Sequence, residues 1–70
     1  MDREPVDSSN IESIGYDAAS KILEVEFRNG SIYQYKGISQ EIYNELMEAD
    51  SVGSFLHRII KNVYACERVE

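Results

Sequence analysis

The stretch KILEVEFRNGSIYQYK, residues 21–36, decides the fold of this chain. Its first half places alternate apolar side chains, among them Leu23 and Val25, on one face of an extended strand and charged side chains on the other. Asn29-Gly30 interrupts this alternation, and the second half resumes it in extended form. An Asn-Gly pair between two such segments is a specific signal of a β-hairpin.

The length of the hairpin loop sets the direction of two tyrosines. A two-residue loop would place Tyr33 and Tyr35 on the face of the glutamates. A three-residue loop over residues 28–30, with Gly30 in the left-handed conformation, pairs Val25 with Tyr33 instead. The second register keeps apolar side chains against apolar ones, so we favour it.

The remaining segments predict one more strand and two helices. Residues 10–16 contain β-branched and aromatic side chains in loose alternation, which favours a first strand. Residues 40–50 have apolar side chains at helical spacing behind Ser39, a good N-cap. A second helix is predicted to begin at Val52 or Ser54 and to run to about residue 62.

The order of these elements predicts an α+β fold, with a small three-stranded antiparallel sheet followed by two helices packed on one face. A length of 70 residues allows one domain with one thin core. We expect residues 1–8 to be a flexible lead-in, residues 9–64 to form the domain, and residues 65–70 to be a short tail.

Composition excludes several classes of function. The net charge of −6 argues against broad adhesion to nucleic acids or anionic membranes, which are themselves polyanions. No apolar run approaches the roughly 20 residues that a membrane span needs. With one cysteine and one histidine, the chain can form neither an internal disulfide nor a Cys/His zinc site. A cytoplasmic protein without metal or cofactor is therefore expected.

The charge is unevenly distributed along the chain. Residues 1–50 carry eleven acids and four bases, whereas residues 51–70 carry two acids and three bases. His57, Arg58 and Lys61 share the polar side of the second helix, opposite its apolar arc. Two interpretations stay open, since such a face is either a solvated surface or a contact for phosphate or for an acidic partner.

The two tyrosines of the hairpin also allow two interpretations. Tyr33 and Tyr35 either pack in the core, as the favoured register predicts, or form a platform on which unpaired bases stack. Catalysis has little support, because no glycines frame a nucleophilic serine, no glycine-rich phosphate loop is present, and the single histidine has no obvious partner. We expect a protein that is not an enzyme.

Several short motifs occur together in a specific order. They are Ile14-Gly15-Tyr16-Asp17, Leu23-x-Val25-x-Phe27, Asn29-Gly30, Tyr33-x-Tyr35, Ala49-x-Ser51-x-Gly53, and Phe55 through Ile60 to Tyr64. Together they resemble the KTSC domain, a family named after the C-terminal extension of some lysyl-tRNA synthetases that also occurs as small bacterial proteins. The resemblance covers about residues 9–64.

The resemblance implies a domain of unknown function for which RNA binding is a suggestion from the synthetase context. The family pattern carries over onto Tyr33, Tyr35, Ser51, Gly53, Phe55, Ile60 and Tyr64. The chain departs from that pattern at three positions, with Ser39 in place of proline, His57 in place of asparagine and Lys61 in place of arginine. Lysine lacks the bidentate fork of arginine and offers phosphate a point charge.

Two hypotheses follow for a non-enzymatic binding module. The first is contact with RNA, either tRNA or a single strand, through the candidate residues His57, Arg58, Lys61 and Tyr64, with Tyr33 and Tyr35 nearby. The second is a protein-interaction module that uses an exposed sheet edge or a helix face. In either case we expect a monomer or a weak homodimer and no membrane partner.

Overall fold

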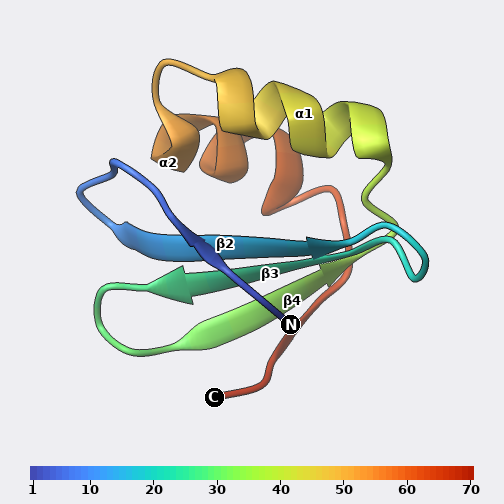
Figure 1. Cartoon of the computed structure of the whole chain (residues 1–70), viewed down its shortest axis with the longest axis horizontal. Helices are drawn as coiled ribbons and strands as arrows, with labels where there is room; N and C mark the ends of the chain where they lie inside the picture. Colours follow the sequence, from blue (N-terminus) through green and yellow to red (C-terminus); the bar gives the residue numbers. More distant parts are fainter.

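The hairpin of residues 21–36 forms as predicted, and the sheet extends from it on both sides (Figure 1). The computed structural model describes all 70 residues. Five antiparallel strands lie in sequence order across the sheet. Their bounds are Glu4–Pro5 for β1, Ile11–Asp17 for β2, Ile22–Phe27 for β3, Ile32–Lys36 for β4 and Cys66–Arg68 for β5.

The prediction of a three-stranded sheet is therefore wrong, because β1 and β5 add an edge strand on each side. Both strands lie in terminal segments, and they span only two and three residues. Neither is long enough to show an alternating pattern, and Pro5 argues against a strand in the sheet interior. Pro5 is tolerated here because β1 is an edge strand, paired only with β2.

The favoured register of the hairpin is confirmed. Val25 lies opposite Tyr33, and Gly30 has φ +94°, in the left-handed region that glycine favours. The Asn29 side chain closes the turn, since its Oδ1 accepts hydrogen bonds from the Ser31 amide at 3.0 Å and the Ser31 hydroxyl at 2.7 Å. The loop sequence thus fixes which side chains of β4 face the core.

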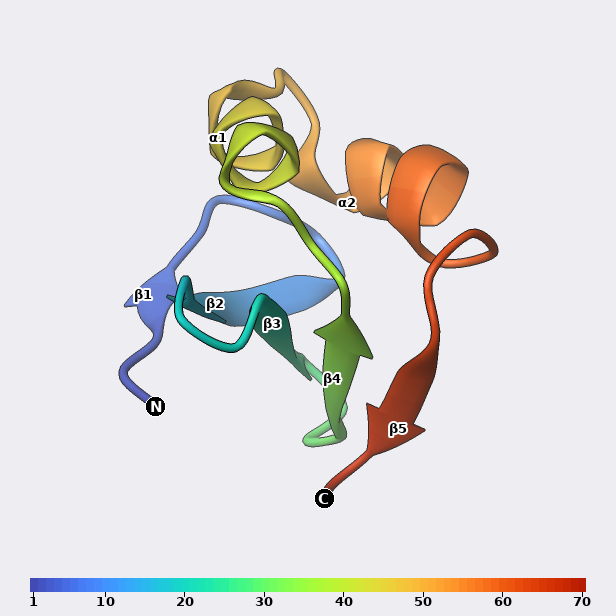
Figure 2. The same ribbon diagram turned by 90° about the vertical axis from the view of Figure 1, so that its right-hand side faces the viewer.

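Both predicted helices are present and cover one face of the sheet, as the end-on view in Figure 2 shows. The first, α1, spans Gln40–Glu48, and the Ser39 hydroxyl accepts a hydrogen bond from the Ile42 amide at 3.2 Å. The second begins as α2 (Val52–Phe55) and continues as a π-helical turn, η1 (Leu56–Ile60). It ends two residues before the predicted residue 62.

The core lies between the helices and the inner face of the sheet. Its ten members are Ile11, Ile14, Leu23, Val25, Tyr35, Ile38, Leu46, Val52, Leu56 and Ile60. Above one edge of it, the ring of Tyr16 stacks on Tyr43 with centroids 4.5 Å apart. No helix has the length and apolar character that a membrane span requires.

The N-terminal arm, residues 1–3, crosses the outer face of the sheet. A Cβ on Gly15 would lie only 2.5 Å from the carbonyl oxygen of Asp2, so the motif glycine in β2 makes room for the arm. Arg3 then reaches Glu24, with which it forms a hydrogen-bonded ion pair. Gln34 donates a second hydrogen bond to the same carboxylate at 2.8 Å. Polar groups on this face are thus paired with one another.

Candidate functional site

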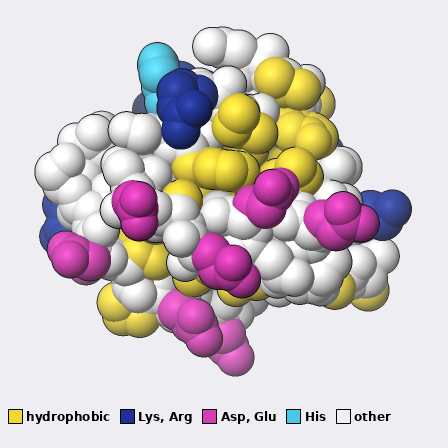
Figure 3. Space-filling model, turned by 90° about the horizontal axis from the view of Figure 1, so that it is seen from above, with side chains coloured by type: hydrophobic (Ala, Val, Ile, Leu, Met, Phe, Trp, Pro, Cys, Tyr) yellow, Lys and Arg dark blue, Asp and Glu magenta, His cyan; other side chains and the backbone are white.

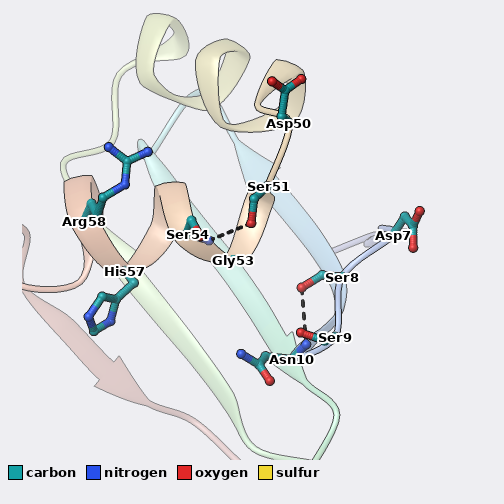
Figure 4. Close-up of a pocket in the computed structure, with 10 residues that line it drawn as sticks. All are labelled: Asp7, Ser8, Ser9, Asn10, Asp50, Ser51, Gly53, Ser54, His57 and Arg58. Atoms are coloured by element: carbon teal, nitrogen blue, oxygen red, sulfur yellow. Dashed lines mark hydrogen bonds between the residues drawn. The ribbon is translucent and has the colours of Figure 1, made fainter.

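Three hollows meet along the side of η1 that faces β3 and the loop before β2. The first, of about 630 Å³, lies between residues 7–10 and the start of α2 (Figure 4). It shares Asn10, Gly53 and His57 with a second hollow of about 100 Å³. The second shares Phe27 and Lys61 with a third of about 320 Å³. The three hollows are therefore neighbours, and we call the surface that they occupy together the groove.

The polar end of the groove is built by a close approach of two segments far apart in the sequence. Gly53 permits this approach, because a Cβ there would stand 3.3 Å from the Ser8 hydroxyl. The Ser8 hydroxyl in turn accepts from the amides of Asn10 and Ile11, each at 3.3 Å. Ser51 caps α2 by accepting from the Ser54 amide at 3.2 Å. The Ser51-x-Gly53 motif thus starts α2 and admits the neighbouring loop.

The lining of the first hollow contains no hydrophobic residue. Figure 4 shows Ser51 and Ser54 at the start of α2 opposite the loop that carries Ser8 and Asn10, while His57 and Arg58 extend from the other side of the helix and the Asp7 and Asp50 carboxylates lie at the margin. The full lining comprises Asp7, Ser8, Ser9, Asn10, Asp50, Ser51, Gly53, Ser54, His57 and Arg58. Such a mixture of donors and acceptors suits a polar ligand.

The π-helical turn places the three basic residues. Its register is marked by the Lys61 amide, which donates to the Leu56 carbonyl oxygen at 2.8 Å. His57 and Lys61 both line the middle of the groove, and Arg58 lines its polar end. All three are exposed, and every ion pair of the chain involves Arg3 or Arg28 instead. These three side chains are therefore free to pair with an anion.

Aromatic side chains form the other end of the groove. Tyr33 is half-buried, and its ring meets Phe27 edge-on with centroids 5.7 Å apart. Tyr35 is only 2% exposed, so it belongs to the core while also reaching the floor of the third hollow. Burial raises the pKa of the Tyr35 hydroxyl, and neighbouring Cys66 and Tyr33 raise it further. The Tyr35 hydroxyl is neutral at physiological pH.

The structure brings together five of the six candidate residues. Tyr33, Tyr35 and Lys61 line the third hollow, while His57 and Arg58 line the first. Tyr64 lines none of the hollows. It packs against the core instead, beside Gly37, where an added Cβ would lie 3.9 Å from its ring.

Several groove residues were missed by sequence reasoning. Asn10 and Phe27 were assigned only to strands, and Asn62 and Ser8 were given no role, yet all four line the groove. No local pattern marks them, because the groove forms where the loop of residues 7–10 meets a helix more than 40 residues later. Only the Ser51-x-Gly53 motif carried a signal of that contact.

Comparison with known proteins gives the chain its relatives. Residues 7–64 match the family model of the KTSC domain. An uncharacterised protein of Stutzerimonas stutzeri is 41% identical over 61 residues, which cover 87% of this chain and 86% of that protein. A lysine–tRNA ligase of Trichormus variabilis is 30% identical over 63 residues, which cover 90% of this chain but 11% of the ligase.

A solved structure has the same fold over its whole length. The crystal structure of a KTSC domain protein from Yersinia pestis superposes with a TM-score of 0.95 at 39% sequence identity, covering 99% of this chain and 97% of that one. Sequence and fold agree over the same residues, including the motifs that build the hairpin and the groove. The chain belongs to the KTSC domain family.

Proposed function

We propose that this KTSC domain is a non-enzymatic module that binds an unpaired segment of RNA along the groove. The observation that carries this proposal is the row of exposed, unpaired basic residues between a polar hollow and an aromatic one. Lys61 lines both the second and the third hollow, so one cation lies between the two ends.

The basic residues supply the contact for the RNA backbone. His57, Arg58 and Lys61 lie within five residues of one another and have no carboxylate partner in the chain. Phosphate contacts of this kind position a strand without reading its sequence. The net charge of −6 limits the contact to this local surface, because RNA is repelled by the acidic remainder of the protein.

The aromatic hollow supplies the contact for a base. Unpaired bases stack on aromatic side chains, and each such contact contributes about 1–3 kcal/mol. Tyr33 is half-buried, so part of its ring is accessible, and its edge-on contact with Phe27 holds the ring in place. Asn29 and Asn62 line the same hollow and offer amide groups to the polar edge of a base. A stack on Tyr33 is compatible with core packing of Tyr35.

The relatives add independent support. Two lysine–tRNA ligases, from Trichormus variabilis and from a Nostoc species, contain a segment similar to 90% of this chain. The name of these relatives includes tRNA, although the matched segment is only 11% of each protein. This context favours RNA over DNA as the polymer.

The test is a fluorescence-anisotropy titration with short single-stranded RNAs and with tRNA at about 50 mM salt. Single strands release about 0.7 counterions per phosphate contact, so two to three contacts give a slope of log K against log salt of about −1.4 to −2. We expect Lys61→Ala to weaken binding about three- to fivefold and to flatten the slope. The matched control is Lys36→Ala, an exposed lysine that lines no hollow.

A pair of variants tests the stacking contact separately. Tyr33→Phe keeps the aromatic ring and should bind as the parent does, whereas Tyr33→Leu keeps an apolar side chain against the core and should lose about tenfold in affinity. Absence of binding at low salt would refute the proposal. Equal losses for Lys61→Ala and Lys36→Ala would do so as well, because they would indicate only diffuse electrostatic attraction.

A further inference from the structure

The outer surface of the two helices carries an apolar patch that the groove does not use. Ile59 is 36% exposed, and Phe55, one turn before it, is half-buried beside the core. Ile42 of α1 is likewise half-buried against the core. We call these three side chains the helix patch. Figure 3 shows apolar side chains gathered over the helices, with acidic side chains along one margin and basic ones at another.

The geometry of α1 explains the acidic margin. Tyr43 stacks on Tyr16 of β2, so the flank of α1 that carries Tyr43 faces the β2 side of the molecule. Ile42 and Glu45, three residues apart, lie on the opposite flank, which faces α2. Glu45 is exposed and forms no ion pair within the chain. It therefore lies on the α1 side of the helix patch.

The basic margin comes from the second helix. Arg58 directly precedes Ile59, is exposed, and forms no ion pair within the chain. The helix patch thus has an unpaired acid on its α1 side and an unpaired base on its η1 side. A patch with this arrangement is complementary to itself, because a two-fold axis lying along the patch exchanges the two sides.

We propose that the helix patch is the interface of a symmetric homodimer. A two-fold axis parallel to the helices brings the Ile59 side chains of the two copies together in the centre. The same rotation sets Glu45 of one copy against Arg58 of the other, twice. The apolar area is small, so the dimer belongs to the weak class of interfaces. Ile59 and Glu45 line no part of the groove, whereas Arg58 lines its polar end. Changes at Ile59 and Glu45 therefore test the dimer apart from RNA binding.

The test is sedimentation equilibrium of the full chain from about 10 to 1000 µM at about 0.15 M salt, where the Debye length of about 8 Å screens the repulsion between two acidic chains. We expect a monomer–dimer equilibrium within this range. Ile59→Asn should weaken it at least tenfold. Val69→Asn, which changes an exposed apolar residue beyond β5, is the matched control and should leave it unchanged.

Charge reversal tests the two sides of the patch and does not touch the core. Glu45→Arg alone and Arg58→Glu alone should each weaken the dimer about fivefold, because each sets like charges against one another. The double variant restores opposite charges and should return to within about twofold of the parent. The proposal would be overturned if the parent chain were monomeric at every concentration, or if Ile59→Asn left the dimerisation affinity unchanged. It would also be overturned if the double variant dimerised no more tightly than either single variant.

Discussion

Charged side chains on the outer face of the sheet form ion pairs, whereas the basic side chains of the groove do not. On the outer face, Arg3 pairs with Glu24 and approaches Glu26 at 3.7 Å, and its Nε donates to the Ser13 hydroxyl at 3.1 Å. In the groove, neither His57 nor Lys61 has an ion-pair partner. Paired, partly buried charges hold the fold together, whereas unpaired, exposed ones are available to a ligand.

The contrast predicts that changes on the outer face alter stability and that changes in the groove alter binding. Gly15→Ala should have the largest effect, because its Cβ would displace the backbone of Asp2 and pull Arg3 from Glu24. We expect a loss of about 2–3 kcal/mol in the free energy of unfolding, measured by urea denaturation.

Deletion of residues 1–3 provides the control for this prediction. Without the arm, the Cβ of Gly15→Ala no longer meets the Asp2 carbonyl oxygen, so the substitution should add little further loss. An unchanged urea midpoint for Gly15→Ala in the full chain would contradict the position of the arm on the sheet.

Arg3→Met should have the next largest effect, about 1–2 kcal/mol at pH 7, because it leaves the Glu24 carboxylate with Gln34 as its one remaining partner. Burial raises the pKa of Glu24, but the hydrogen bonds from Gln34 and Arg3 outweigh it and hold the pKa below 4.5. The stabilisation is therefore present above about pH 4.5 and is lost as the pH falls through the folded-state pKa.

The difference in stability between the parent and Arg3→Met should accordingly shrink in urea titrations below pH 4.5. The matched variant is Arg28→Met, whose partner Glu12 is 51% exposed and whose own side chain is 47% exposed. That substitution should cost no more than about 0.5 kcal/mol at any of these pH values. A cost for Arg3→Met that is independent of pH would show that its packing, and not its charge, stabilises the outer face.

The two regions also differ in how far the sequence predicts them. The hairpin was predictable because Asn29-Gly30 and the alternating strands act over a few residues. The edge strands β1 and β5 were not predictable from the sequence, because they are stabilised by pairing with distant strands and show no alternation of apolar and polar residues. The position of the N-terminal arm likewise depends on contacts with distant strands. Within β2, only the small residue Gly15 is consistent with a chain segment packed on the sheet.

The groove was predictable in its charges but not in its shape. The basic residues of the second helix stand out because the rest of the chain is acidic. The hollow beside them depends on the approach of Ser8 to Gly53, a contact between segments 45 positions apart. The face of the sheet on which Tyr33 and Tyr35 lie was predictable from the length of the hairpin loop, because a shift of one residue in register moves both side chains to the opposite face.

Replacing the three basic residues of the groove together tests the other half of the comparison. The triple variant His57→Gln, Arg58→Gln and Lys61→Gln should keep its free energy of unfolding within about 0.5 kcal/mol of the parent, because exposed and unpaired charges contribute little. The same variant should bind RNA at least tenfold more weakly. A marked loss of stability would mean that these side chains stabilise the fold, and it would contradict the assignment of the groove as a binding site.

The smallest expected effect concerns the acidic margin of the groove. Asp50 lines the polar hollow together with His57 and Arg58, so its carboxylate opposes a phosphate that approaches them. Asp50→Asn keeps the size and polarity of the side chain and should raise RNA affinity about twofold at low salt. Glu48→Gln removes the same charge from an exposed position on α1 that lines no hollow, and should change affinity less. Equal gains from the two variants would assign the effect to net charge alone and would place the phosphate away from the polar end of the groove.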